Sequence, residues 1–144
     1  MTGRSNPPAV GEVIPYWFLW HSEHEAGEES GRKLRPCVVV IALKTDDDKT
    51  RISVLPITHV PPNPTRRAVE VPARVKATLG LDDGRSWIVC DEFNEFEWPG
   101  FDIGKTPDGF AAFGRLPLGL LNAVRAEVVA ARKAGAHKAV PRDD

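Results

Sequence analysis

Short apolar runs alternate with polar turns along much of the chain. The runs are rich in Val, Ile and aromatic residues, a composition typical of β-strands. The predicted strands are 11–20, 37–43, 51–56, 68–71 and 86–93, and a more polar stretch continues the last one to residue 98. Gly, Pro and Asp fill the segments between them, as is usual for turns. The expected connections are a loop at 21–34, a hairpin turn at 45–50, a Pro-rich loop at 58–67, an irregular or single-turn helical stretch at 75–81 and a turn at 82–84.

The pattern changes period near the C-terminus. Apolar residues there recur at the spacing of an amphipathic helix, at Leu120, Leu121, Val124, Val128 and Ala131. Pro117 suits the first turn of this helix and Gly135 suits its end. We therefore expect one mainly β domain at 11–135, a small barrel-like sheet closed by a C-terminal helix. An extended or disordered tail at 1–10 and a frayed tail at 136–144 should flank it.

The composition is that of an ordinary globular protein. The 144 residues carry a formal net charge of −1, with 42% hydrophobic and 27% charged residues. No apolar run reaches the length of a membrane span, and residues 1–10 lack the apolar core of a signal peptide. These features predict a cytoplasmic protein without membrane contact. Cys37 and Cys90 lie in apolar runs, which favours two buried, reduced thiols over a disulfide or a metal pair.

The net charge restricts the partners of the protein. Proteins that bind nucleic acids usually carry an excess of Lys and Arg, because contacts with phosphate supply much of their affinity. This chain has no such excess, so a nucleic-acid site would have to be a local patch. Cations gather at residues 32–35 and 66–76, whereas acids gather at 23–29, 46–48 and 82–102.

Arg35 is the most distinctive candidate for binding. It precedes Pro36 and the apolar run 37–43, and Pro is accepted at the start of a strand, where no ladder donor is required. A guanidinium fixed at a strand entrance suits a phosphate or carboxylate, which it binds through paired donors. The alternative is that Arg32, Lys33 and Arg35 are solvated charges at the end of a strand.

Two further clusters allow a functional interpretation. His21 and His24, with Glu23 and Glu25, offer ligands for a divalent metal, but their spacing matches no zinc motif, and a polar loop readily collects such residues. The aromatic residues of the stretch 17–20 could stack on nucleic-acid bases. In so apolar a strand, packing in the core or in a dimer explains them better.

Several short motifs occur in a characteristic order along the chain. They are Gly11-Glu12-Val13-Ile14, Glu25-Ala26-Gly27, Arg35-Pro36-Cys37-Val38-Val39-Val40, Val54-Leu55-Pro56-Ile57-Thr58, Cys90-Asp91-Glu92-Phe93-Asn94-Glu95-Phe96 and Phe113-Gly114-Arg115-Leu116. Taken in this order, between Gly11 and Lys133, they resemble the MazF/PemK family of toxin endoribonucleases. The resemblance rests on the ordered set of motifs.

This resemblance implies a small SH3-like β-barrel of the MazF/PemK/CcdB type with a C-terminal helix, usually a homodimer. It implies a type II toxin that cleaves single-stranded RNA at short sequence motifs, without a metal or other cofactor. A cognate antitoxin protein would neutralise it. The catalytic Arg and Thr of the family fall on Arg35 and Thr58. The candidate RNA contacts are Arg32, Lys33, His59, Arg66 and Arg67.

Arg35 and Thr58 suit the attack of an RNA 2′-hydroxyl on the adjacent phosphate. That reaction needs proton transfer and stabilisation of the charge that develops on the phosphoryl oxygens. Arg35 can stabilise this charge and Thr58 can add a hydrogen bond, but a guanidinium does not act as a base. His59 is a candidate base because histidine titrates near neutrality. Against this, the alternation of a strand turns His59 away from the side that Thr58 faces.

Two other functions stay open. The acidic loop 21–34 and the near-neutral net charge disfavour RNA, which such carboxylates repel. Asn94 and Glu95 also replace a basic and a hydroxyl residue of the family pattern. The chain could therefore be a catalytically degenerate relative that acts as a protein-binding module. The third possibility is a barrel toxin that acts on a protein target such as gyrase, using its terminal helix.

Overall fold

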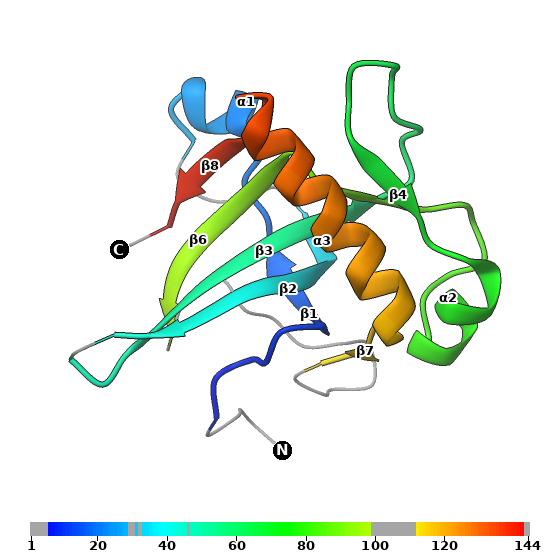
Figure 1. Ribbon diagram of the computed structural model, residues 1–144, viewed down its shortest axis with the longest axis horizontal. Helices are drawn as coiled ribbons and strands as arrows, with labels where there is room; N and C mark the ends of the chain where they lie inside the picture. Colours follow the sequence, from blue (N-terminus) through cyan, green and yellow to red (C-terminus); the bar gives the residue numbers. More distant parts are fainter. Residues whose placement is uncertain (1–5, 29–30, 32, 46, 99–111, 143–144) are drawn as a thin grey trace.

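A curled sheet and a C-terminal helix make up most of the protein (Figure 1). The computed structural model describes residues 6–28, 31, 33–45, 47–98 and 112–142. Within these residues the strands are β1 (Glu12–Trp17), β2 (Leu34–Lys44), β3 (Thr50–Thr58), β4 (Ala68–Glu70), β5 (Trp87–Val89), β6 (Glu92–Trp98), β7 (Gly114–Arg115) and β8 (Lys138–Pro141). The helices are α1 (His21–Glu25), α2 (Ala73–Leu79) and α3 (Leu118–Lys133). The predicted fold, mainly β with a small barrel-like sheet and a C-terminal helix, is confirmed.

The sheet is organised around β3. Its strand order is β4-β5-β3-β2-β1-β7, and β6 pairs both with β3 and, in parallel, with β8. One edge of β3 carries two strands, because Ile57 pairs with Ile88 of β5 and Val54 pairs with Asn94 of β6. The predicted continuous strand at 86–93 is therefore wrong. The chain leaves the ladder between β5 and β6, where the Asp91 side chain binds the Arg67 amide and the Arg66 guanidinium.

The central strands are buried on both faces. In β2, Val38 and Val40 pack in one apolar cluster with α2 and α3, whereas Cys37 and Val39 pack in a second cluster on the opposite face. Successive strand residues point to opposite faces, so an unbroken apolar run is required here. A bulge between Val39 and Ile41 shifts the register against β3.

The C-terminal helix covers the first of these clusters. α3 lies across β2 and β3 (Figure 1), and it contributes Leu121 and Val124 to the cluster. Pro117 is its N-cap residue, and Gly135, with a φ of +67°, follows its end. The predicted amphipathic helix is thus confirmed.

Two short helices replace stretches predicted as irregular. α2 is longer than the predicted single turn, beginning after Pro72 and ending before Gly80. Gly80 has a φ of +69°, the left-handed conformation that commonly ends a helix. α1 lies inside the predicted loop 21–34, where the Glu23 carboxylate accepts a hydrogen bond from the Trp20 amide.

The predicted frayed tail at 136–144 is wrong in its described part. β8 pairs in parallel with β6, from Glu92 opposite Lys138 to Glu95 opposite Pro141. The following residue, Arg142, is buried. A tail that donates and accepts ladder bonds has a lower free energy than a frayed one, although its local sequence is polar.

Both cysteines are free and buried, as predicted. Burial raises the pKa of Cys90 to about 12 and raises that of Cys37 as well, so both thiols stay protonated and unreactive in the folded protein. Among the residues described, no helix has the length and apolar character needed to cross a membrane.

Candidate functional site

Arg35 is fixed near the start of β2. It is the second residue of the strand and lies opposite Tyr16 of β1. Its guanidinium carbon lies 5.2 Å from the centre of the Trp20 ring, a cation–π arrangement that orients the side chain. The backbone and the ring together hold the guanidinium in one place.

The charge of Arg35 is not compensated by a carboxylate within ion-pair distance in the described part of the chain. Its buried Nε atom also lacks a hydrogen-bond partner there. Burial lowers the pKa of Arg35, which the neighbouring Cys37 and Glu23 oppose, but a guanidinium remains charged at neutral pH. A half-buried cation with an unused donor is stabilised when an anion binds to it. Arg35 thus supplies the charge for an anion site.

Thr58 ends β3 and is 9% exposed. Its Oγ1 accepts a hydrogen bond of 3.2 Å from the Val60 amide at the start of the following loop. A hydroxyl can accept and donate at once, so the Thr58 hydrogen stays available for a ligand. The strand thus extends beyond the predicted 51–56 and includes the first residue of the predicted loop 58–67.

Arg35 and Thr58 lie between two neighbouring cavities and line both of them. The first cavity has a volume of about 650 Å³ and the second about 720 Å³. Because the two residues belong to both cavities, an extended ligand could pass over them and occupy space on either side. The structure therefore brings the two predicted catalytic residues into one groove.

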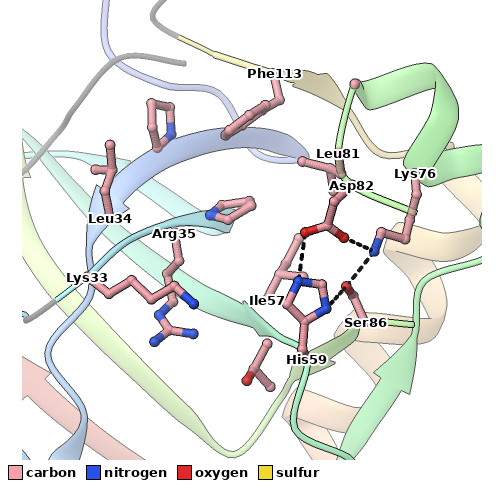
Figure 2. A pocket seen from close by; sticks show the side chains of 14 residues that line it. Lys33, Leu34, Arg35, Ile57, His59, Lys76, Leu81, Asp82, Ser86 and Phe113 are labelled. Carbon is pink, nitrogen blue, oxygen red and sulfur yellow. Dashed lines mark hydrogen bonds and ion pairs between the residues drawn. The ribbon is translucent and has the colours of Figure 1, made fainter. Parts of the chain in front are cut away.

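The first cavity is lined by both apolar and charged side chains. Its apolar lining residues are Pro15, Leu34, Pro36, Ile57, Leu81 and Phe113. Figure 2 shows Lys33 and Arg35 on one side and His59 and Asp82 on the other. Lys33 thus lies where it could contribute a second positive charge to a bound anion.

His59 belongs to a connected polar network (Figure 2). Its Nε2 lies 2.7 Å from Asp82 Oδ2, and its Nδ1 lies 2.8 Å from the Arg85 carbonyl oxygen. Lys76, whose side chain is 5% exposed, donates to Asp82 Oδ1 at 2.8 Å and to Ser86 Oγ at 2.7 Å. The network joins α2 to the end of β3.

This network makes His59 part of a cavity wall. Both ring nitrogens already face oxygen partners, so neither is open to a substrate in this arrangement. The alternation of strand residues predicted that His59 would face away from Thr58, and this is wrong. The chain leaves β3 after Thr58, so both residues line the first cavity. The hydrogen bond from Lys76, and secondly that from His59, lowers the pKa of Asp82.

The cations of the second predicted patch have partners of their own. Arg66 lines the second cavity, but it pairs with Asp91 at 2.9 Å and with Glu92 at 2.7 Å. Burial alone would lower the pKa of Arg66, yet these hydrogen bonds raise it. Arg67 lines neither cavity and pairs with Glu127 of α3 at 3.1 Å. Arg32, also a predicted contact, lies outside the described residues.

Several site residues could not be identified from the sequence. The predicted core packing of Trp20 is confirmed, since it packs against the second apolar cluster, but the sequence did not show that its ring would also lie 5.2 Å from the Arg35 guanidinium carbon and 5.7 Å from that of Arg66. Lys76 sits in an ordinary amphipathic helix, and nothing in its local sequence marks it as buried. The sequence Asp82-Asp83-Gly84 predicted a turn, but it did not show that Asp82 would contact His59.

The two histidines of α1, His21 and His24, do not form a metal-binding site with other described side chains. His21 Nε2 lies 3.9 Å from Glu25 Oε1, one helical turn away. In the part of the chain that the structure describes, no group of three or more His, Cys, Asp or Glu side chains could hold a metal ion.

Comparison with models of known protein families gave no match for the chain, and no curated protein has a matching sequence.

Proposed function

We propose that the protein is the toxin of a type II toxin–antitoxin system, an endoribonuclease of MazF/PemK type that cleaves single-stranded RNA. The observation that carries this proposal is that Arg35, which has no carboxylate within ion-pair distance among the described residues, lines the same two cavities as Thr58. A groove with a cation at its centre and space on both sides suits a chain molecule with a central anion.

In the proposed reaction the 2′-oxygen of RNA attacks the adjacent phosphorus. The bond from phosphorus to the 5′-oxygen breaks, a water molecule takes the 2′-proton, and the 5′-oxygen takes a proton from water. Arg35 stabilises the negative charge that develops on the phosphoryl oxygens, and Thr58 donates a further hydrogen bond. His59, with both nitrogens engaged, holds the cavity wall.

The resemblance to this family also gives the proposal its partners. They are single-stranded RNA, a second copy of the chain in a homodimer, and an antitoxin protein. Cytoplasmic action follows from the substrate, which is mRNA.

Cleavage of a mixed RNA pool by the purified protein tests the proposal. Wild type should produce fragments that share a short sequence at their ends and carry a 2′,3′-cyclic phosphate, in the presence of a metal chelator. An RNA with a 2′-deoxy sugar at the cleaved position should resist, because the attacking oxygen is missing.

Arg35 variants identify the source of the activity. Arg35→Ala should lower the cleavage rate by about a hundredfold or more, because a preorganised donor to the transition state is lost. Arg35→Lys should be intermediate, since the charge remains but the paired donors do not. Arg132→Ala, on the exposed side of α3, is the matched control and should cleave as wild type does. Equal cleavage by wild type and Arg35→Ala would contradict the proposal, and no cleavage by wild type would favour the protein-binding alternatives.

A further inference from the structure

The segment between β1 and α1 is held by side chains from distant parts of the chain. Residues 18–20 belong to no strand or helix, so their backbone groups need other partners. Asn94, fully buried in β6, accepts a hydrogen bond from the Leu19 amide at 2.9 Å and donates one to the Leu19 carbonyl at 2.8 Å. At the end of the segment, the His21 amide donates to Glu92 Oε1 at 2.6 Å.

Arg142 completes this set of contacts from the C-terminal side. Its NH1 donates to the Trp17 carbonyl at 2.8 Å and to Asn94 Oδ1 at 2.9 Å. Its guanidinium carbon lies 5.5 Å from the centre of the Tyr16 ring, and the residue is only 6% exposed. A buried guanidinium of this kind is retained where its geometry is needed, because its desolvation is costly.

β8 delivers Arg142 to this position. The strand pairs with β6 up to Glu95 opposite Pro141, and the Arg142 amide then donates to the Glu95 carbonyl at 2.7 Å. The Arg142 guanidinium therefore links the Trp17 carbonyl, at the end of β1, to the Asn94 side chain, which in turn binds the backbone of Leu19.

Trp20 is the next residue along this clamped segment. Its ring packs edge-on against Phe18 at 5.2 Å and supports the guanidinium of Arg35 at 5.2 Å. The backbone of residues 18 and 19 connects the end of β1 to Trp20, the N-cap residue of α1, and Asn94 holds this backbone at Leu19. A displacement of the Leu19 backbone would thus move the Trp20 ring and, with it, the Arg35 guanidinium.

We propose that Arg142 is a positioning residue for Arg35, acting through Asn94, the backbone of residues 17–19 and the Trp20 ring. The inference rests on the proposed function for its catalytic consequence. A shift of about 1 Å in a catalytic group can cost about a hundredfold in rate, so a residue outside both cavities controls the chemistry. The expected loss lies in kcat, because the contact is with charge that forms in the transition state.

The test compares Arg142→Met with Arg132→Met, an exposed arginine of α3. Arg142→Met removes the donors and the charge while keeping a long apolar side chain. We expect kcat for RNA cleavage to fall by about tenfold to a hundredfold, with KM changed by less than about twofold. The Arg132→Met control should retain both constants.

A second readout does not depend on cleavage. In two-dimensional NMR spectra, the Arg35 Nε–Hε and Trp20 indole N–H resonances should move in Arg142→Met and stay in place in Arg132→Met. If these resonances move and wild type does not cleave RNA, the positioning role stands and the proposed function fails. If wild type cleaves RNA and Arg142→Met keeps both kcat and resonances, the positioning role is overturned and the proposed function stands.

Arg142→Lys decides the matter if Arg142→Met does not fold. Lysine retains the charge and one donor but not the planar fork, so a smaller loss of kcat and smaller movement of the same two resonances are expected. A folded Arg142→Lys protein with unchanged resonances and unchanged kcat would overturn the proposal.

Discussion

The role of each arginine is set by its neighbours in space. Arg35, Arg66 and Arg67 look alike in the sequence, yet Arg66 pairs with two carboxylates and Arg67 with Glu127, whereas Arg35 has an aromatic ring. The paired arginines hold the structure together at the second cavity and at α3. Of these three, Arg35 has no carboxylate within ion-pair distance among the described residues, so its guanidinium is the one open to an anion.

The hydroxyl of Thr58 gives a prediction at a single atom. Thr58→Val keeps the shape of the side chain but removes the donor, so RNA cleavage should slow by about a hundredfold. The Val60 amide also loses its acceptor, which should cost about 1 kcal/mol of unfolding free energy. Thr58→Ser retains the hydroxyl and should keep most of the activity. A Thr58→Val protein as active as Thr58→Ser would contradict a role for the hydroxyl.

Asp82 gives a prediction about acid stability. Its pKa is lowered first by the hydrogen bond from Lys76 and then by that from His59. The carboxylate therefore stabilises the folded protein above its unfolded pKa, and this contribution is lost as the pH falls through the lower folded pKa. The urea midpoint of wild type should fall more steeply below about pH 4 than that of Asp82→Asn.

Asp83→Asn is the matched control for this experiment. It leaves the contacts of Asp82 with Lys76 and His59 in place and should retain the steep acid dependence of wild type. If Asp82→Asn and wild type lose stability in parallel as the pH falls, the polar network contributes nothing to acid stability.

At the scale of elements, the sequence predicted a helix and a hairpin that depend on interactions between residues close together in the chain. The stripe from Leu120 to Ala131 predicted α3, and the Asp-rich turn predicted the hairpin of β2 and β3. β8 and the break between β5 and β6 were missed, because both depend on pairing with strands far away in the sequence. α2 could have been predicted, since Pro72 and Gly80 mark its two ends.

The end of α2 provides a clean test of backbone conformation. A Cβ on Gly80 would contact nothing within 4 Å, so only its φ of +69° opposes a side chain. Gly80→Ala should therefore destabilise the protein by about 1 kcal/mol. Gly119→Ala is the control, because it also meets open space but lies in α3 without a positive φ, and it should stabilise slightly. Chemical denaturation measures both, and equal effects of the two substitutions would refute this account.

At the scale of the molecule, two apolar clusters share the same central strands. The unbroken apolar run 37–43 agrees with burial on both faces of β2, but the sequence did not show which elements would cover each face, because this depends on how the sheet curls. Only part of the candidate site could be predicted from the sequence. The resemblance placed Arg35 and Thr58, whereas Trp20, Lys76 and Arg142 acquire their roles only through contacts between distant segments.

Leu55 tests the strength of the shared core. It is fully buried in β3, and Leu55→Ala should lower the unfolding free energy by about 2–5 kcal/mol through lost burial and the cavity left behind. Leu43→Ala makes the same chemical change at a residue that is 62% exposed and should cost less than about 0.5 kcal/mol. Urea unfolding of both variants gives the comparison. A similar loss at the two sites would mean that the cluster around Leu55 is not a packed core.

The double burial of β2 leaves its alignment with β1 to features other than hydrophobicity. A slip of one residue would exchange the two faces of the strand, and both faces would still meet apolar neighbours. Pro15 lies opposite Pro36, and neither residue has a backbone N–H, so both missing donors fall at one position of the ladder. A slipped strand would scatter them and would turn Arg35 away from Trp20. The two prolines thus favour the alignment in which Arg35 lies against Trp20.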